Sequence, residues 1–94
     1  MADITAIGVL GDIVKIAHSS DDPANLKALQ AQAASRIDQF KRDLAIARLQ
    51  PGVAKRQTDS LRRKLDAARS GRPESSVQGI VFREALRRLT GEDE

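Results

Sequence analysis

Apolar residues recur at every third or fourth position between residues 23 and 49, and this spacing is the strongest constraint on the fold. The stripe consists of Leu26, Leu29, Ala33, Ile37, Phe40, Leu44 and Ala47. Residues spaced in this way share one face of an α-helix, which has about 3.6 residues per turn. We therefore predict one long helix over residues 23–49, with Asp22 as its N-cap and Pro23 at its first position.

Three shorter helices are predicted around this long one. Residues 4–18 are apolar around most of a helical circumference, so neighbouring segments must cover them. We interpret Gly8 and Gly11 in this segment as points where another helix approaches closely. A third helix is expected over about residues 53–69, after Pro51 and Gly52 have ended the long helix.

The last predicted helix begins at Ser75 or Ser76 and ends at Gly91. Within it, residues 77–82 leave a strand as an alternative, which is disfavoured because the chain offers no second strand to pair with it. The sequence thus predicts an all-α fold, a small helical bundle or helical hairpin. We expect a single domain over residues 1–94, in which residues 91–94 form a short acidic tail.

Large apolar side chains are few in this chain. Leu, Ile, Val and Phe supply 23 of the 94 residues, and 14 more residues are Ala. A small chain of this composition builds a thin core, so we expect a homo-oligomer that buries additional surface. The residues expected in the core or at the oligomer interface are Ile7, Leu10, Val14, Ile37, Phe40 and Leu44.

The residue types that most catalytic and metal sites require are scarce. The chain has no Cys, Trp or Tyr, and its only histidine is His18. His18 lies near a predicted helix C-terminus, where the helix dipole favours it without any chemical role. Asp21 and Asp22 do not match the spacing of a calcium loop, and no glycine-rich phosphate loop is present. We therefore expect no enzymatic activity, no cofactor and no metal ion.

Positive charge is concentrated in the middle of the chain, where residues 36–90 hold 14 basic and 6 acidic residues. In the third predicted helix, charges of alternating sign recur at helical spacing, which predicts a solvent-exposed face crossed by salt bridges. That face consists of Lys55, Asp59, Arg62, Asp66 and Arg69. The surplus cations are Arg56, Arg63, Lys64 and Arg72. A second basic patch consists of Arg83, Arg87 and Arg88, partly neutralised by Glu84; we expect the acidic tail to fold back onto it or onto a neighbouring subunit.

Two hypotheses for function follow from these features. The first is a non-enzymatic interaction or assembly protein, a homo-oligomeric structural component, adaptor or small inhibitor that docks on a larger protein, as do many accessory proteins of bacteria and phages. The second is a polyanion binder that holds DNA, RNA or a phosphorylated small ligand through the basic residues of the third helix. The second basic patch serves either phosphate or protein contacts.

We expect a cytoplasmic location. No apolar run reaches the length of about 18 residues that a membrane span needs, and no signal peptide is recognisable. Attachment of the first helix to a membrane surface is disfavoured, because Lys15 is the only cation in its polar stripe.

Overall fold

The computed structural model describes residues 5–91 as four α-helices and one 3-10 turn, with no strand in that range. The helices are α1 (Ala6–Ala17), α2 (Leu26–Ile46), α3 (Pro51–Ser70) and α4 (Val77–Thr90), and the 3-10 turn η1 (Pro23–Asn25) precedes α2. The prediction of an all-α fold is confirmed, and residues 77–82 are helical rather than extended. The predicted contacts of the acidic tail involve residues 92–94, which lie outside the described range.

The helix boundaries follow from local hydrogen bonds and backbone geometry. Thr5 Oγ1 accepts a hydrogen bond of 3.2 Å from the backbone N–H of Gly8 at the start of α1. Ser76 Oγ accepts one of 3.0 Å from the N–H of Gly79 at the start of α4, and Gly91 ends that helix with a φ of 75°.

The predicted long helix is shorter than expected at both ends. Residues 23–25 form the 3-10 turn, and α2 stops at Ile46, just before Arg48 adopts a φ of 53°. Pro51 is the first residue of α3, whereas we expected it in the break before a helix that begins near residue 53. As a result α3 has 20 residues, and α2 has 21. Since α2 exceeds α3 by one residue only, the expectation of one long helix set apart from three shorter ones is not confirmed.

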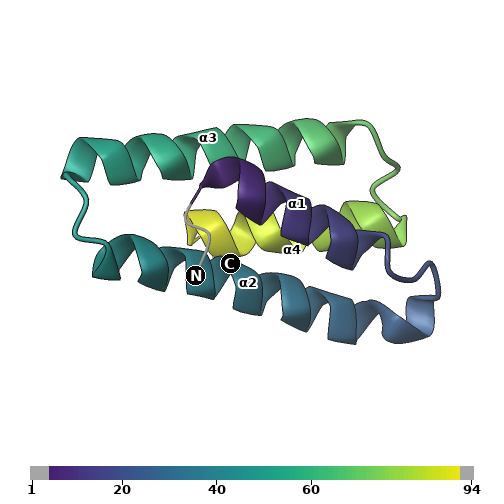
Figure 1. Cartoon of the computed structure of the whole chain (residues 1–94). Helices are drawn as coiled ribbons and strands as arrows, with labels where there is room; N and C mark the ends of the chain where they lie inside the picture. The colour runs from purple at the N-terminus through teal and green to yellow at the C-terminus, as the bar shows by residue number, and fades with distance from the viewer. Residues whose placement is uncertain (1–4, 92–94) are drawn as a thin grey trace.

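Figure 1 shows α2 and α3 on opposite sides of the bundle, with α1 and α4 between them. Both α1 and α4 contact α2 and α3, and they also contact each other. The loop from residue 71 to residue 76 turns the chain back, so that α4 runs antiparallel to α3. The position of α4 is therefore fixed by its contacts with the three other helices.

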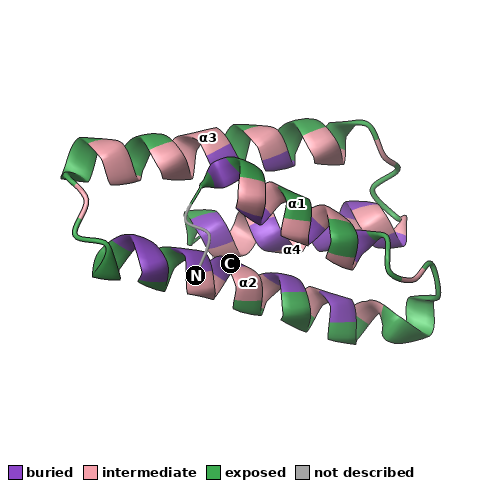
Figure 2. Cartoon of the chain, viewed as in Figure 1, coloured by how far each residue is buried: buried purple, intermediate pink, exposed green. Residues whose placement is uncertain are grey.

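Every helix contributes to a single core (Figure 2). Ile37 and Phe40 are fully buried and Leu44 is almost so, together with Phe82 of α4. From Leu29 to Leu44 the stripe is thus covered within one chain, whereas Ala47 lies beyond the end of α2 and is exposed.

The residues of α1 that were predicted for the core or the oligomer interface are less buried than those of α2. Leu10 and Val14 are half-buried and pack against the core. Ile7 is 73% exposed and is therefore not a core residue of the chain. Among the four helices of residues 5–91, none combines the length and the apolar character of a membrane span.

Glycine permits a close approach at Gly79, whereas Gly11 is not such a point. Around Gly11 an added Cβ would meet nothing within 4 Å, so the interpretation of Gly11 as a contact point is wrong. At Gly79 a Cβ would lie 2.4 Å from the carbonyl oxygen of Pro73. The missing side chain of Gly79 therefore lets the 71–76 loop pack against the first turn of α4.

Candidate anion-binding groove

A groove of about 650 Å³ runs between α3 and α4 on the surface of the bundle. It is lined by Arg62, Arg63, Asp66, Arg69, Arg83, Leu86, Arg87 and Thr90. Five of these eight residues are arginines, three from α3 and two from α4. We call this feature the arginine groove.

The packing of the two helices places the arginines at this position. On α3, Arg62 directly follows Leu61, which is fully buried, and on α4, Arg83 directly follows Phe82, which is also fully buried. Neighbouring residues on a helix are separated by about 100°, so a residue that follows a core residue lies at the rim of the helix interface. The apolar contacts that join α3 to α4 thus bring Arg62 and Arg83 to the same groove.

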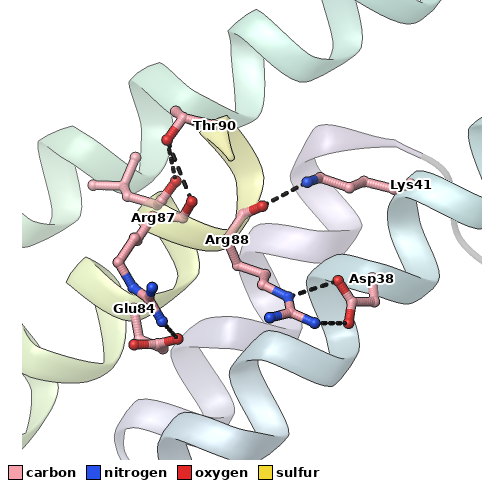
Figure 3. Close-up of polar contacts among 7 residues, drawn as sticks. Asp38, Lys41, Glu84, Arg87, Arg88 and Thr90 are labelled. Atoms are coloured by element: carbon pink, nitrogen blue, oxygen red, sulfur yellow. Dashed lines mark hydrogen bonds and ion pairs between the residues drawn. The ribbon is translucent and has the colours of Figure 1, made fainter. Parts of the chain in front are cut away.

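Two of the groove arginines are paired with carboxylates. Arg69 Nη2 lies 2.9 Å from Asp66 Oδ1 one turn away on α3, and Arg87 Nη2 lies 2.6 Å from Glu84 Oε2 on α4 (Figure 3). Three further arginines have no hydrogen-bond or ion-pair partner in the described part of the chain, namely Arg62, Arg63 and Arg83. Within residues 5–91, the five groove arginines are thus met by two carboxylates, Asp66 in the lining and Glu84 beside it, and three positive charges remain in excess.

The chemistry of the groove is that of binding. A guanidinium group is a rigid fork of N–H donors that matches phosphate and carboxylate oxygens, and it stays protonated in proteins. The only hydroxyl in the lining, on Thr90, donates to carbonyl oxygens of its own helix at 3.1 and 3.4 Å. Among residues 5–91, the lining thus contains five guanidinium groups and one carboxylate, and no histidine, lysine or cysteine.

The structure separates the basic residues predicted from the sequence. Arg63, Arg83 and Arg87 meet in the arginine groove, whereas Arg56 and Lys64 do not line it. Arg56 Nε donates a long bond of 3.4 Å to the Gly52 carbonyl, and Lys64 Nζ donates to Ser60 Oγ at 3.1 Å. These two side chains lie along α3, outside the groove.

Arg72 has a structural role at the end of the bundle. Its guanidinium lies over the ring of Phe82, 5.0 Å from the ring centroid, and Nη1 donates to the Ala68 carbonyl at 2.8 Å. Nη2 lies 3.1 Å from Nε2 of His18, which accepts this bond because arginine has no acceptor. These contacts join the 71–76 loop to α1 and α4, so Arg72 is not available as a surplus cation.

Arg88 is engaged with α2 and also lies outside the groove. Its Nε and Nη2 donate to the two carboxylate oxygens of Asp38 at 2.9 and 2.8 Å, and Lys41 Nζ donates to its backbone carbonyl (Figure 3). The hydrogen bonds from Arg88 lower the pKa of Asp38 below its ordinary value, and the nearby charges of Arg88, Lys41 and Arg42 act in the same direction. Arg88 therefore ties α4 to α2.

Sequence reasoning missed Arg62 and Arg69 as groove residues, because it assigned them to a face crossed by salt bridges. Of the alternating charges on α3, only Asp66 and Arg69 form an ion pair within residues 5–91. The signal that could have found Arg62 was present in the sequence. That signal is its spacing from Arg69: the two residues are seven positions apart, nearly two helical turns, so they lie on the same side of α3.

Among residues 5–91, no group of three or more His, Cys, Asp or Glu side chains is arranged to hold a metal ion. No protein-family model, curated protein or solved structure matches the chain.

Proposed function

We propose that the protein is a non-enzymatic binding protein that holds a polyanion in the arginine groove. The observation that supports this most strongly is the convergence on one groove of three arginines, from two helices, that have no polar partner within residues 5–91. Like charges brought together on a surface repel each other, and a ligand with closely spaced negative groups relieves that repulsion. Arginine forms charge-assisted and often bidentate bonds with such groups.

Inorganic tripolyphosphate, titrated calorimetrically at about 50 mM salt, tests this proposal. The groove variant is Arg62→Gln with Arg83→Gln, which removes one unpartnered arginine from each wall. Its matched control is Arg42→Gln with Arg48→Gln, which removes the same charge from exposed positions in and just after α2. Hydrogen bonds to charged groups contribute about 1.5–3 kcal/mol each, so the groove variant is expected to lose at least about tenfold in affinity.

The control variant is expected to bind tripolyphosphate nearly as well as the wild type, because its substitutions leave the groove intact. Equal losses in the two double variants would show that net charge, and not the groove, attracts the ligand. Absence of any binding by the wild type at this salt concentration would reject the proposed function.

Self-association, as an assembly protein, is the second candidate function. It is favoured by Ile7 and Ile46, which are 73% and 76% exposed. Because contiguous apolar patches mark protein interfaces and single exposed residues do not, these two side chains support this function less strongly than the groove supports anion binding. Sedimentation velocity at tens of micromolar protein tests this function. It is supported if the wild type forms a dimer or larger species and the double variant Ile7→Ser with Ile46→Ser is a monomer. It is rejected if the wild type is a monomer.

A further inference from the structure

The outward face of α3 carries two rows of cations that extend beyond the arginine groove. Lys55 and Arg62 are seven residues apart, and so are Arg56 and Arg63. Seven residues are nearly two helical turns, so each row runs along the helix with about 10 Å between its members. We call these four exposed residues the α3 cation face. Figure 2 shows α3 along one edge of the bundle, with exposed and half-buried residues over most of its length.

The charges of the α3 cation face are only partly offset by neighbours, since the half-buried Asp59 lies one turn from all four residues but forms no ion pair within residues 5–91. Lys55, Arg62 and Arg63 have no hydrogen-bond or ion-pair partner within residues 5–91, and Arg56 has only its long bond to a backbone carbonyl. Asp66, the exposed carboxylate on the same side, is engaged by Arg69. Across the groove, Arg83 of α4 adds a fifth cation beside this face.

The surroundings of these cations argue against a protein partner. Protein interfaces are organised around buried apolar and aromatic side chains. The large apolar residues exposed in the described range are Ile7 and Ile46, and neither lies on α3 or α4. A surface of cations without an apolar centre is instead suited to a polyelectrolyte.

The chain also lacks the means to bind single strands through their bases. Proteins that bind single-stranded nucleic acids stack the bases on aromatic side chains. The two aromatic residues of this chain, Phe40 and Phe82, are both fully buried. Contacts with phosphates are therefore the mode of nucleic-acid binding that this surface permits. A duplex presents its phosphates in two continuous rows.

From this arrangement we infer that α3 lies along the major groove of B-form DNA, with the α3 cation face and Arg83 on the phosphates. This inference rests on the proposed function and extends the binding surface beyond the arginine groove. An α-helix is about 10–12 Å wide and the major groove of B-DNA about 12 Å, so the helix fits. With 20 residues α3 is about 30 Å long, which corresponds to about nine base-pair steps.

The choice of DNA over duplex RNA follows from the same dimensions. The major groove of A-form RNA is deep and narrow, and protein side chains do not enter it. Specific contacts with adenine are not expected, because no Asn or Gln is exposed on α3; any base preference is expected to be for guanine, through the exposed arginines. The amide of Gln57 is half-buried, and its Oε1 accepts the backbone N–H of Ala6.

Fluorescence anisotropy with a labelled mixed-sequence DNA duplex, two helical turns long, tests the inference. Five phosphate contacts predict that log K falls with log salt with a slope of about −4 to −5. The diagnostic variant is Lys55→Gln with Arg56→Gln, since both residues are exposed and neither lines the arginine groove. It is expected to bind DNA at least about tenfold more weakly, with a slope smaller by about 2, and to bind tripolyphosphate like the wild type.

The same control as before, Arg42→Gln with Arg48→Gln, is expected to keep most of the DNA affinity, and circular dichroism checks that each variant is folded. If the Lys55 and Arg56 substitutions affect DNA binding no more than the control does, the inference is wrong while the proposed function stands. An RNA duplex of the same sequence that binds as tightly as DNA would overturn the major-groove geometry. If the wild type does not bind tripolyphosphate, the proposed function itself is rejected.

Discussion

Replacing Phe40 with alanine is expected to remove a large part of the stability of the fold. The ring of Phe40 is fully buried in the core that α2 shares with α4, and Ile37 and Phe82 are fully buried in the same core. Truncating a buried phenylalanine costs about 3–5 kcal/mol, whereas a small domain has about 5–15 kcal/mol in total. For a domain of this size each kcal/mol lowers Tm by about 4–8 °C, so Tm is expected to fall by at least about 12 °C.

Thermal denaturation followed by far-ultraviolet circular dichroism measures this change. The control is Arg63→Ala, since Arg63 is exposed and has no polar partner within residues 5–91. Such a surface substitution changes stability by about 0.5 kcal/mol or less, so its Tm is expected to stay within about 4 °C of the wild type. A Phe40→Ala protein that melts within about 2 °C of the wild type would show that the stripe on α2 faces solvent.

Further predictions concern packing at a glycine and one ion pair. Gly79→Ala is expected to lower the free energy of unfolding by about 1–3 kcal/mol, because its Cβ would lie 2.4 Å from the Pro73 carbonyl, whereas Gly11→Ala is expected to raise it by about 1 kcal/mol. Urea denaturation compares the two, and shifts of the same sign would contradict the packing at Gly79. The hydrogen bonds from Arg88 lower the pKa of Asp38, so this pair stabilises the fold above a pH of about 4, and the stabilisation is lost as the pH falls through the lowered pKa. Between a pH of about 5 and about 2 the wild type is therefore expected to lose more stability than Asp38→Asn. The difference is expected to be less than about 1 kcal/mol, because both side chains of the pair are partly exposed. Equal losses in the two proteins would show that the Asp38–Arg88 pair does not stabilise the fold.

Helical periodicity allowed most of the fold to be predicted from the sequence. The apolar stripe from Leu26 to Leu44 predicted α2, and the serine at position 76 marked the start of α4. The ends of the helices were less well predicted, because they depend on single residues whose effect varies with position. Pro51 is one example: the sequence predicted that it ends the preceding helix, but α2 stops at Ile46, before Arg48 with its φ of 53°, and Pro51 instead begins α3.

The arginine groove could be predicted only in part, since its two walls come from different helices. The sequence identified Arg63 on one helix and Arg83 and Arg87 on another as basic, but it contained no information that α3 and α4 pack side by side. It also could not tell which cations the fold would occupy. Arg88 is occupied by Asp38, which is 50 positions away in the chain, and that pairing depends on the packing of α2 against α4.

The position of α4 links the stability of the fold to the shape of the arginine groove. Phe82 and Leu89 of this helix are buried in the core, while Arg83 and Arg87 lie on its groove side. Because α4 contacts α1, α2 and α3, its distance from α3 is set by core packing and not by a bound anion. A groove formed in this way requires little rearrangement when a ligand arrives, so less of the binding free energy is spent on ordering. The cost of placing Arg62, Arg63 and Arg83 at one groove is instead borne by the core on folding, and under the proposed function their mutual repulsion is relieved by the bound anion.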